Sequence, residues 1–383
     1  MKKKILFVVG ARPNFMKVAP VMKEMSKCPA EFAQLLVHTG QHYDEEMSGS
    51  FFDSLDLVVP DIYLGVGSGT HAVQTGRILI EFEKVCTQHK PDLIIVVGDV
   101  NSTVACALGA AKLRIPVAHI EAGLRSFDRT MPEEINRILT DQIADYLFTT
   151  CRDGNQNLKR EGIQKEKIFF VGNVMIDTLL SHQERARNSN ILEKLGLRRN
   201  NRIRRYILVT LHRPSNVDDQ EILKGILKSL NQLAKKVPVI FPAHPRTIKM
   251  MRHFELLGMV KYRERILSGR IGQASREVLV IPPLGYIDFL CLMSRAAVVF
   301  TDSGGIQEET TILGIPCLTL RNNTERPITV KEGTNILVGN DPDKIVKTAR
   351  EVLKSGTPSQ KVPRLWDGKA AERIVKILRT ALS

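Results

Sequence analysis

Hydrophobic residues of this chain gather in twelve short continuous runs, and each run is followed by polar residues and a stretch with helical spacing. Runs in the first half of the chain are KILFVVG, QLLVHTG, DLIIVVGD, PVAHIEAG, DYLFTT and KIFFVGN. Runs in the second half are RYILVTLHR, VPVIFPAHP, EVLVIPPLG, AAVVFTDSGG, IPCLTL and NILVGN. Near-continuous apolar strands separated by helices are typical of parallel sheets buried on both faces and built from right-handed βαβ units.

The alternation pauses between about residues 178 and 204, where the sequence is polar and rich in Arg and Asn. A chain of 383 residues exceeds what a single hydrophobic core supports. The pattern therefore predicts an α/β protein with two doubly wound, Rossmann-like domains in tandem that face a central cleft. Ligands of such sheets bind at the carboxyl ends of the strands, so the polar residues that directly follow each run are the candidates for chemistry.

Composition narrows the class of protein. The net charge of +14 is compatible with an anionic polymer or an anionic small molecule as partner. The densest basic run, RRNNRIRR at 198–205, contains no aromatic residue for base stacking, so we interpret it as a solvated linker and expect no nucleic-acid partner. Six widely spaced cysteines predict free thiols and no zinc site. Apolar runs too short for membrane insertion, and an N-terminus unlike a signal peptide, favour a cytoplasmic protein.

The motif DSGGIQEE at 302–309 places two glycines in the first turn of a predicted helix, where glycine is unfavourable. A helix N-terminus leaves backbone N–H groups unpaired and attracts phosphate, and glycines remove the side chains that would shield those groups. We interpret Ser303 and Gly304 as part of a diphosphate site, with Glu308 or Glu309 reaching ribose hydroxyls. The alternative is that Ser303 only caps the helix.

Several other polar residues follow predicted strands. Arg12 and Lys17 in GARPNFMK are candidate anion clamps, and Arg321 and Arg326 in TLRNNTERP are candidate contacts to the same diphosphate. Candidate acid and base groups are Asp99, Glu121, Glu133 and His212, the last of which could also be a structural loop histidine. For Glu133 a structural role, in a capping box with Thr130 and a helical pairing with Arg137, is as compatible with the spacing as a role in catalysis. The stretch GVGSGT does not fit the dinucleotide fingerprint, so no nicotinamide cofactor is expected.

Seven motifs, in this order along nearly the whole chain, resemble the non-hydrolysing UDP-N-acetylglucosamine 2-epimerase family: GARPNFMKVAPV, HTGQHYDEEM, GDVNST, HIEAGLRS, PEEINR, TDSGGIQEE and RNNTERP. The resemblance implies the two-domain GT-B fold, with the C-terminal helix returning to the first domain, and a homodimer. It places an N-terminal domain at residues 1–172 plus 364–383 and a UDP-binding domain at 173–363.

The resemblance also implies reversible inversion at C2 of UDP-N-acetylglucosamine. UDP is eliminated to give 2-acetamidoglucal, which is reprotonated at C2 on its other face as UDP adds back, without metal or redox cofactor. By position, Arg12, His212, Ser303 and Gly304 would hold the diphosphate and Glu309 the ribose. Arg137, Arg326 and Lys17 would support the cleft, while Asp99, Glu121 and Glu133 would be the acid and base groups.

Two departures from the family pattern leave the sugar open. Many members read GTRPE where this chain has Gly10 to Asn14, and HRxEN where it has His212 to Asn216. A 2-epimerase acting on a modified UDP-N-acetyl sugar and a GT-B glycosyltransferase are the alternatives to epimerisation of UDP-N-acetylglucosamine for surface polysaccharide. A non-catalytic binder of anions is a third class, and steep salt dependence would distinguish it.

Overall fold

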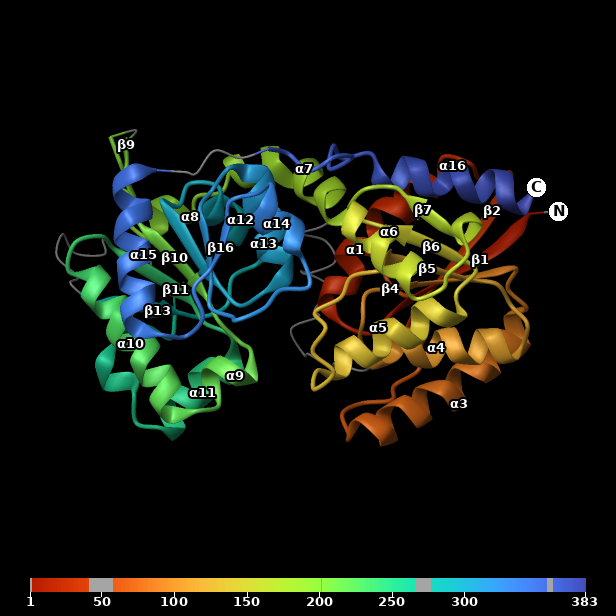
Figure 1. The fold of residues 1–383 in the computed structure, drawn as a ribbon, viewed down its shortest axis with the longest axis horizontal. Helices are drawn as coiled ribbons and strands as arrows, with labels where there is room; N and C mark the ends of the chain where they lie inside the picture. Colours follow the sequence, from red (N-terminus) through yellow and green to blue (C-terminus); the bar gives the residue numbers. More distant parts are fainter. Residues whose placement is uncertain (1, 41–57, 201, 266–276, 357–360) are drawn as a thin grey trace. The chain divides into compact units, whose positions relative to one another are not determined.

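The structure is a computed structural model that describes residues 2–40, 58–200, 202–265, 277–356 and 361–383 (Figure 1). The chain divides into two compact units. The N-terminal unit comprises Met1–Ser181 and Arg364–Ser383, and the C-terminal unit comprises His182–Pro363. The family resemblance implied a division at 172/173. The structural division falls later because helix α7 (Val174–Arg187) runs across it without interruption.

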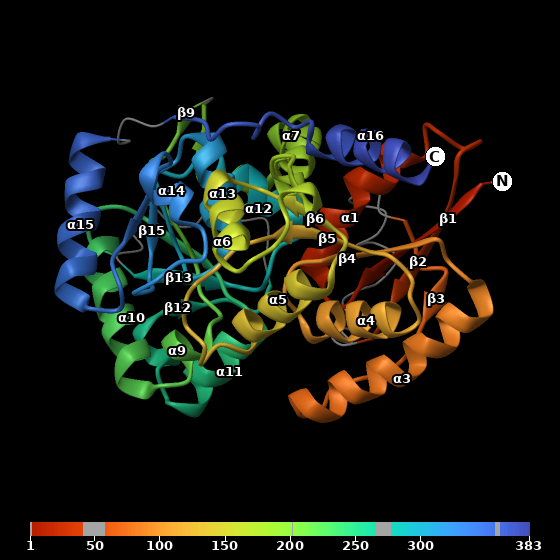
Figure 2. The same cartoon turned by 45° about the vertical axis from the view of Figure 1, so that its right-hand side comes forward.

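The N-terminal unit contains a seven-stranded parallel sheet in the order β3-β2-β1-β4-β5-β6-β7. Its strands are β1 Lys3–Val9, β2 Phe32–His38, β3 Ile62–Tyr63, β4 Leu93–Val97, β5 Val117–Ala122, β6 Tyr146–Thr149 and β7 Ile168–Phe170. Its helices, besides α7, are α1 Arg12–Met25, α3 His71–His89, α4 Asn101–Lys112, α5 Pro132–Ile143, α6 Arg152–Arg160, the short η1 Lys165–Lys167 and α16 Ala370–Leu382. Helices α3, α4 and α5 lie side by side along one face of the sheet (Figures 1 and 2).

The C-terminal unit contains a second seven-stranded parallel sheet, in the order β12-β13-β11-β10-β14-β15-β16. Its strands are β10 Ile207–Thr210, β11 Val239–Pro242, β12 Lys261–Tyr262, β13 Val278–Ile281, β14 Val298–Thr301, β15 Cys317–Thr319 and β16 Asn335–Leu337. Its helices are α8 Ile191–Lys194, α9 Pro214–Val217, α10 Gln220–Ala234, α11 Pro245–His253, η2 Leu257–Met259, α12 Tyr286–Met293, α13 Gly304–Leu313, α14 Pro327–Lys331 and α15 Pro342–Ser355.

These two sheets confirm the predicted fold class, and the reason lies in the apolar runs. All five residues of β4 are buried, as are all four of β13 and β14, because helices cover both faces of a doubly wound sheet. In each unit the strand order reverses once, between β1 and β4 and between β10 and β14. Such a reversal opens the carboxyl edge of the sheet to ligands, so the residues at this edge are the candidates for a binding site.

The basic run at 198–205, interpreted as a solvated linker, contains an antiparallel pair of two-residue strands, β8 (Arg198–Arg199) and β9 (Arg202–Ile203). Asn200 fits the turn because its φ of 48° lies in the left-handed region that Asn tolerates. The six cysteines are all free, and all but the half-buried Cys28 are buried, as the sequence predicts. Of the motif HTGQHYDEEM, only residues 38–40 lie among the described residues.

Charge is divided unevenly between the two units. The C-terminal unit contains 30 Lys and Arg against 17 Asp and Glu, a net charge of +13. The N-terminal unit contains 25 basic and 24 acidic residues, a net charge of +1. Nearly the whole positive charge of the chain therefore belongs to the unit with α13.

Candidate active site

In the N-terminal unit, the turn from β1 into α1 is fixed by Asn14, which sequence analysis did not single out. The Asn14 Oδ1 accepts hydrogen bonds from the backbone N–H of Gly10 at 3.1 Å and of Ala11 at 3.0 Å. Its Nδ2 donates to the carbonyl of Val97, the last residue of β4, at 3.3 Å. Asn14 thus ties the ends of the two strands at which the sheet order reverses. Arg12 begins α1 from this turn and is half-buried.

Glu121, at the end of β5, is one of the few residues other than glycine with a left-handed backbone, at φ 76°. The pairing of β5 with β6 shifts register between Ile120 and Ala122, so Glu121 occupies a bulge that turns its side chain. Left-handed backbone of this kind is costly for a residue with a Cβ and is concentrated at functional sites. The Glu121 carboxylate, only 6% exposed, forms an ion pair with the Lys17 ammonium. Lys17, a predicted anion clamp, is in the structure the partner of a candidate acid or base.

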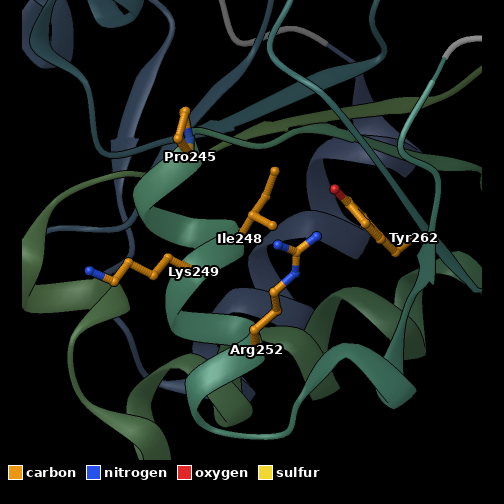
Figure 3. Close-up of a pocket in the computed structure, with 5 residues that line it drawn as sticks. All are labelled: Pro245, Ile248, Lys249, Arg252 and Tyr262. Carbon is orange, nitrogen blue, oxygen red and sulfur yellow. The ribbon is translucent and has the colours of Figure 1, made fainter. Parts of the chain in front are cut away.

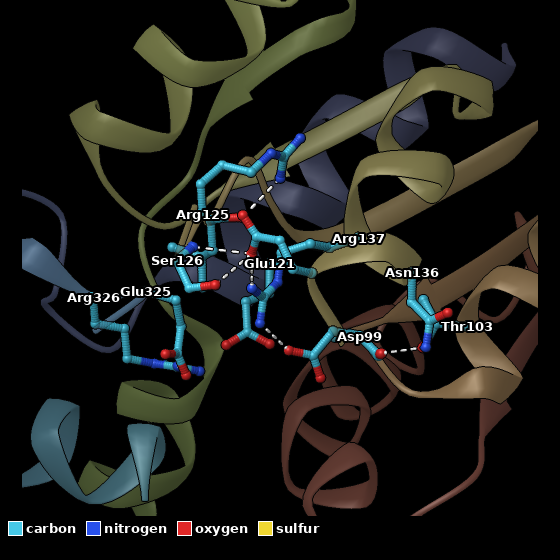
Figure 4. A network of polar contacts seen from close by, with 12 residues as sticks. Asp99, Thr103, Glu121, Arg125, Ser126, Asn136, Arg137, Glu325 and Arg326 are labelled. Atoms are coloured by element: carbon cyan, nitrogen blue, oxygen red, sulfur yellow. Dashed lines mark hydrogen bonds and ion pairs between the residues drawn. The ribbon is translucent and has the colours of Figure 1, made fainter. Parts of the chain in front are cut away.

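Asp99 follows β4 after Gly98, and β4 pairs with the strand that carries Glu121 (Figure 4). Its carboxylate pairs with the Arg137 guanidinium and is 30% exposed, so a ligand can reach it. Its carbonyl accepts a hydrogen bond from Asn136 Nδ2 at 2.9 Å. The structure thus brings together Asp99, Glu121, Lys17 and Arg137 at the carboxyl edge of β4 and β5.

Glu133 is half-buried on the first turn of α5, and the next residue, Glu134, makes the structural contacts of that turn. The predicted capping box is wrong, because the N-cap of α5 is Met131 and no side chain caps it. The predicted helical pair is also wrong, because Arg137 pairs with Glu134 and Asp99. Glu134 is buried and accepts hydrogen bonds from the backbone N–H groups of Ser126 and Phe127, both at 2.9 Å. The structural role that the sequence offered for Glu133 therefore belongs to its neighbour.

In the C-terminal unit, Asp302 organises the turn after β10. Its fully buried carboxylate accepts hydrogen bonds from the backbone N–H of His212 at 3.0 Å and of Arg213 at 2.9 Å, and from Asn216 Nδ2 at 3.1 Å. Burial alone would raise the pKa of Asp302, but these donors and the His212 ring lower it. The carboxylate lies 3.1 Å from Nδ1 of His212, whose side chain is 43% exposed. Asp302 thus orients His212 and keeps its other ring nitrogen available.

The first turn of α13 separates the roles of its two glycines. Ser303 is the N-cap residue, yet its side chain makes no capping hydrogen bond, so capping alone does not explain this serine. A Cβ on Gly304 would lie 2.6 Å from Cζ of Arg326, and still closer to its Nη1, and 2.9 Å from Oε1 of Glu325. A Cβ on Gly305 would meet nothing within 4 Å. Gly304 therefore makes room for Arg326, whereas only Gly305 leaves open space at the helix end.

Arg326 belongs to a cluster of buried charges above α13, visible beside Glu325 in Figure 4. Its Nε lies 2.8 Å from Glu308, and its Nη1 pairs with Glu325. Glu325 also pairs with Arg321 at 2.8 Å and with the half-buried Arg213 at 3.5 Å. Burial would raise the pKa of Glu325, but Arg326, Arg321 and Arg213 hold it well below the usual range. Three guanidinium groups share two carboxylates in this cluster, which lies beside the helix N-terminus.

Glu309 is 2% exposed and accepts a hydrogen bond of 2.7 Å from the hydroxyl of Tyr286. Burial, together with repulsion from Glu308, raises the pKa of this carboxyl to about 7. The predicted contact of Glu309 with ribose would therefore have to share or replace the tyrosine hydroxyl. His244 caps α11, because its Nδ1 accepts a hydrogen bond from the backbone N–H of Arg246 at 3.2 Å.

A pocket of about 310 Å³ lies elsewhere on the C-terminal unit, between α11 and β12. It is lined by Pro245, Ile248, Lys249, Arg252 and Tyr262, with the Arg252 guanidinium 5.7 Å from the centre of the Tyr262 ring (Figure 3). None of the predicted site residues lines it. Within the described ranges there is no group of three or more His, Cys, Asp or Glu placed to hold a metal ion. Likewise, no helix of the described part of the chain is long and apolar enough to cross a membrane.

Each unit thus contributes a distinct chemistry. The N-terminal unit offers two carboxylates beside cations at neighbouring strand ends, which suits proton transfer next to developing positive charge. The C-terminal unit offers a helix N-terminus, a buried cluster of arginines and an oriented histidine, which suits a diphosphate. Asn14, Glu134, Asp302 and Glu325 were absent from the sequence-based site. Of these, only Asp302 gave a usable signal, a carboxylate that follows an apolar strand without a break.

Comparisons with known proteins agree with this chemistry. The family model described as UDP-N-acetylglucosamine 2-epimerase matches residues 24–379. The UDP-N-acetylglucosamine 2-epimerase of Methanocaldococcus jannaschii is 43% identical, with 98% of each chain covered. The UDP-2,3-diacetamido-2,3-dideoxy-D-glucuronate 2-epimerase of Pseudomonas aeruginosa is also 43% identical, with 98% of this chain and 99% of that one covered.

Among solved structures, the M. jannaschii UDP-GlcNAc 2-epimerase in complex with UDP-GlcNAc and UDP superposes with a TM-score of 0.87 at 43% identity. The superposition covers 98% of this chain and 99% of that one. The chain belongs to the UDP-N-acetylglucosamine 2-epimerase family, and it is therefore an isomerase. This confirms the resemblance drawn from the seven motifs.

Proposed function

We propose that the protein reversibly converts UDP-N-acetylglucosamine to UDP-N-acetylmannosamine by eliminating UDP and adding it back. The observation that carries the proposal is the pair of carboxylates, Asp99 and Glu121, that end adjacent strands and each face a cation. A proton at C2 of the sugar has no neighbouring carbonyl to acidify it. Its removal is feasible when the C1–O bond to UDP breaks in the same phase, which builds positive charge at C1 that a carboxylate stabilises.

The steps balance without an external oxidant. A base takes the C2 proton, the electrons of that bond form the C1–C2 double bond, and the C1–O electrons leave with UDP. An acid then returns a proton to the opposite face of C2, and the UDP oxygen attacks C1. Asp99, Glu121 and Glu133 are the candidates for these proton transfers, since they lie at the carboxyl edge of β4 and β5 or on the first turn of α5.

The leaving group needs cations and hydrogen-bond donors. We assign the diphosphate to the N-terminus of α13 with Ser303 and Gly304, and to His212, Arg326 and Arg12. Glu309 is assigned to the ribose, and Arg137 and Lys17 hold the carboxylates. The solved relative in complex with UDP-GlcNAc and UDP supports a ligand of this chemistry.

Proton NMR in deuterated water tests the reaction directly. Incubation with UDP-N-acetylglucosamine is expected to give a new manno anomeric signal, with deuterium at C2 of both epimers and no free sugar. An Asp99→Asn variant and a Glu121→Gln variant should each lose deuterium incorporation. Release of free N-acetylmannosamine would contradict reversible epimerisation, and incorporation of deuterium by neither wild type nor variants would contradict C2 deprotonation.

A modified sugar is the second candidate substrate. The P. aeruginosa relative acts, by its name, on a diacetamido sugar with a uronic carboxylate, and it matches this chain at the same 43% identity as the M. jannaschii enzyme. Competition between UDP-N-acetylglucosamine and the corresponding UDP-2,3-diacetamido uronate in the same assay separates the two. The substrate with the higher kcat/KM identifies the sugar.

The protein is further proposed to act as a homodimer in the cytoplasm, supplying surface polysaccharide synthesis. Apolar side chains remain exposed on α3, α4 and α5, namely Ile80, Leu108, Ile135 and Leu139. Because these helices lie side by side, a second copy could cover the residues together. A Leu139→Glu variant should then be monomeric in light scattering where the wild type is dimeric.

The proposed cytoplasmic location rests on a separate observation. Six free cysteines are in keeping with a reducing compartment.

A further inference from the structure

Beneath the carboxylates of the N-terminal unit lies a histidine–aspartate pair that no substrate can touch. His119 and Asp141 are both fully buried, and Nδ1 of His119 lies 2.7 Å from Oδ1 of Asp141. Nε2 of His119 lies 2.8 Å from the carbonyl oxygen of Gly98. A carboxylate and a carbonyl only accept, so both ring nitrogens of His119 donate and the ring carries a positive charge.

The other oxygen of Asp141 is also occupied. It accepts a hydrogen bond from the backbone N–H of Gly123 at 3.0 Å and lies 2.7 Å from Nη2 of Arg125. Arg125 in turn pairs with Glu161 at 2.6 Å. Although burial alone would raise the pKa of Asp141, His119 and Arg125 lower it, so the carboxylate is ionised. The four charged groups alternate in sign, which allows three of them, His119, Asp141 and Arg125, to remain buried while Glu161 is partly exposed.

The contacts of this pair fall on both sides of Glu121. His119 is two residues before Glu121 and Gly123 is two residues after it, and Asp141 holds both. Between these two points the backbone takes its left-handed turn at Glu121, with φ 76° and a shift in strand register. Strained backbone persists only where the surroundings over-determine it, and Asp141 supplies that constraint.

The same pair also contacts the backbone beside the second carboxylate, that of Asp99. Gly98, whose carbonyl accepts from His119, immediately precedes Asp99 and has φ 71°. Its backbone N–H donates to the carbonyl of Ile120 at 3.1 Å, which closes the link between the two strand ends. We propose that Asp141 and His119 form a positioning pair that sets the separation and orientation of Asp99 and Glu121 for proton transfer.

This inference rests on the proposed function, since it assigns a purpose to the pair only if Asp99 and Glu121 transfer protons. An Asp141→Asn variant keeps the shape but lacks the negative charge that holds the protonated ring and Arg125. Misplacement of a reacting group by about 1 Å can lower a rate about 100-fold. We therefore expect kcat of Asp141→Asn to fall about 100-fold, with KM changed by less than a factor of about three because the diphosphate residues are untouched.

Asp145, in the connection between α5 and β6, provides a control that contacts the same strand, β5. Its carboxylate also accepts a backbone N–H from β5, that of Val117 at 3.0 Å, but at the end of the strand away from Glu121. Asp145→Asn should keep kcat within a factor of about two of wild type. Both variants are first checked for unchanged UDP affinity by calorimetry and for folding by circular dichroism at the assay temperature.

A structural readout accompanies the kinetics. Nitrogen-15 NMR of the imidazole groups should show His119 with protons on both nitrogens at neutral pH, and this signature should be lost in Asp141→Asn. An active wild type whose Asp141→Asn variant matches Asp145→Asn in kcat would overturn the positioning role while leaving the proposed function intact. A wild type that incorporates no deuterium at C2 would instead remove the proposed function and this inference with it.

Discussion

Replacing Gly304 and Gly305 one at a time by alanine tests the geometry of the α13 N-terminus. The two positions are adjacent, and both substitutions add a single methyl group to the first turn of the same helix. A new Cβ at residue 304 would lie 2.6 Å from Cζ of Arg326 and 2.9 Å from Glu325, whereas at residue 305 it would meet nothing within 4 Å. The two variants therefore share their helix propensity gain and differ in packing.

The magnitudes follow from the burial of the cluster. Arg326 is 7% exposed and held by Glu308 and Glu325, so it cannot move aside without giving up a buried pair. Overpacking costs about 1–3 kcal/mol, and breaking a buried ion pair costs about 3–5 kcal/mol. Against these stands a gain of up to about 1 kcal/mol from replacing glycine in a helix. We expect Gly304→Ala to lower the free energy of unfolding of the C-terminal unit by about 2–4 kcal/mol, and Gly305→Ala to raise it by up to about 1 kcal/mol.

Urea denaturation followed by fluorescence and circular dichroism measures the stability of both variants, and calorimetry measures their affinity for UDP. If the diphosphate uses the open space at residue 305, Gly305→Ala should bind UDP at least about tenfold more weakly despite being no less stable. A Gly304→Ala variant as stable as wild type would refute the packing argument. A Gly305→Ala variant with unchanged UDP affinity would refute the assignment of the phosphate to this helix end.

Three further predictions address single contacts. Because Ser303 makes no capping bond, Ser303→Ala should change the free energy of unfolding by less than about 0.5 kcal/mol, where loss of a capping serine costs about 1 kcal/mol, yet weaken UDP binding; a loss of stability alone would restore the capping interpretation. Glu309 binds a proton in the folded state between its ordinary pKa near 4.5 and about 7, so its contribution to stability falls as pH rises through that window. The free energy of unfolding of Glu309→Gln should therefore rise relative to that of wild type by roughly 3 kcal/mol from pH 4.5 to 7 in urea titrations. A difference between the two proteins that stays constant with pH would contradict the assignment. Lys17→Met removes the ammonium that pairs with the buried Glu121 carboxylate and should cost about 3–5 kcal/mol, whereas the double variant with Glu121→Gln should recover most of that loss; equal stabilities of the single and double variants would argue against the ion pair.

The twelve apolar runs predicted both large sheets because period and burial agree in a doubly wound fold. The remaining strands were not predicted, for a physical reason. β3 and β12 contain two residues each at sheet edges, where backbone pairing from one side suffices without an apolar run. The β8–β9 pair consists almost entirely of arginine and depends on a left-handed Asn200, which a hydrophobic pattern does not report.

Site residues at strand ends were predictable in position but not in partner. Lys17 was expected to meet an anion from solution and instead meets Glu121 across 104 residues of sequence. Glu133 matched a capping box, but the helix began one residue later and gave the contacts to Glu134. Which of two neighbouring carboxylates meets a given partner depends on where the helix begins, because a shift of one residue rotates every side chain about the helix axis. Sequence spacing alone does not fix the first residue of a helix to within one position.

The uneven division of charge has a kinetic consequence. A UDP-sugar is an anion, and the unit with α13 carries a net charge of +13 while the other unit carries +1. A field of one sign raises the local concentration of oppositely charged ligands and accelerates their diffusional encounter. The nucleotide end of the substrate should therefore be captured before the sugar is aligned, at an association rate that falls as salt shortens the reach of the field.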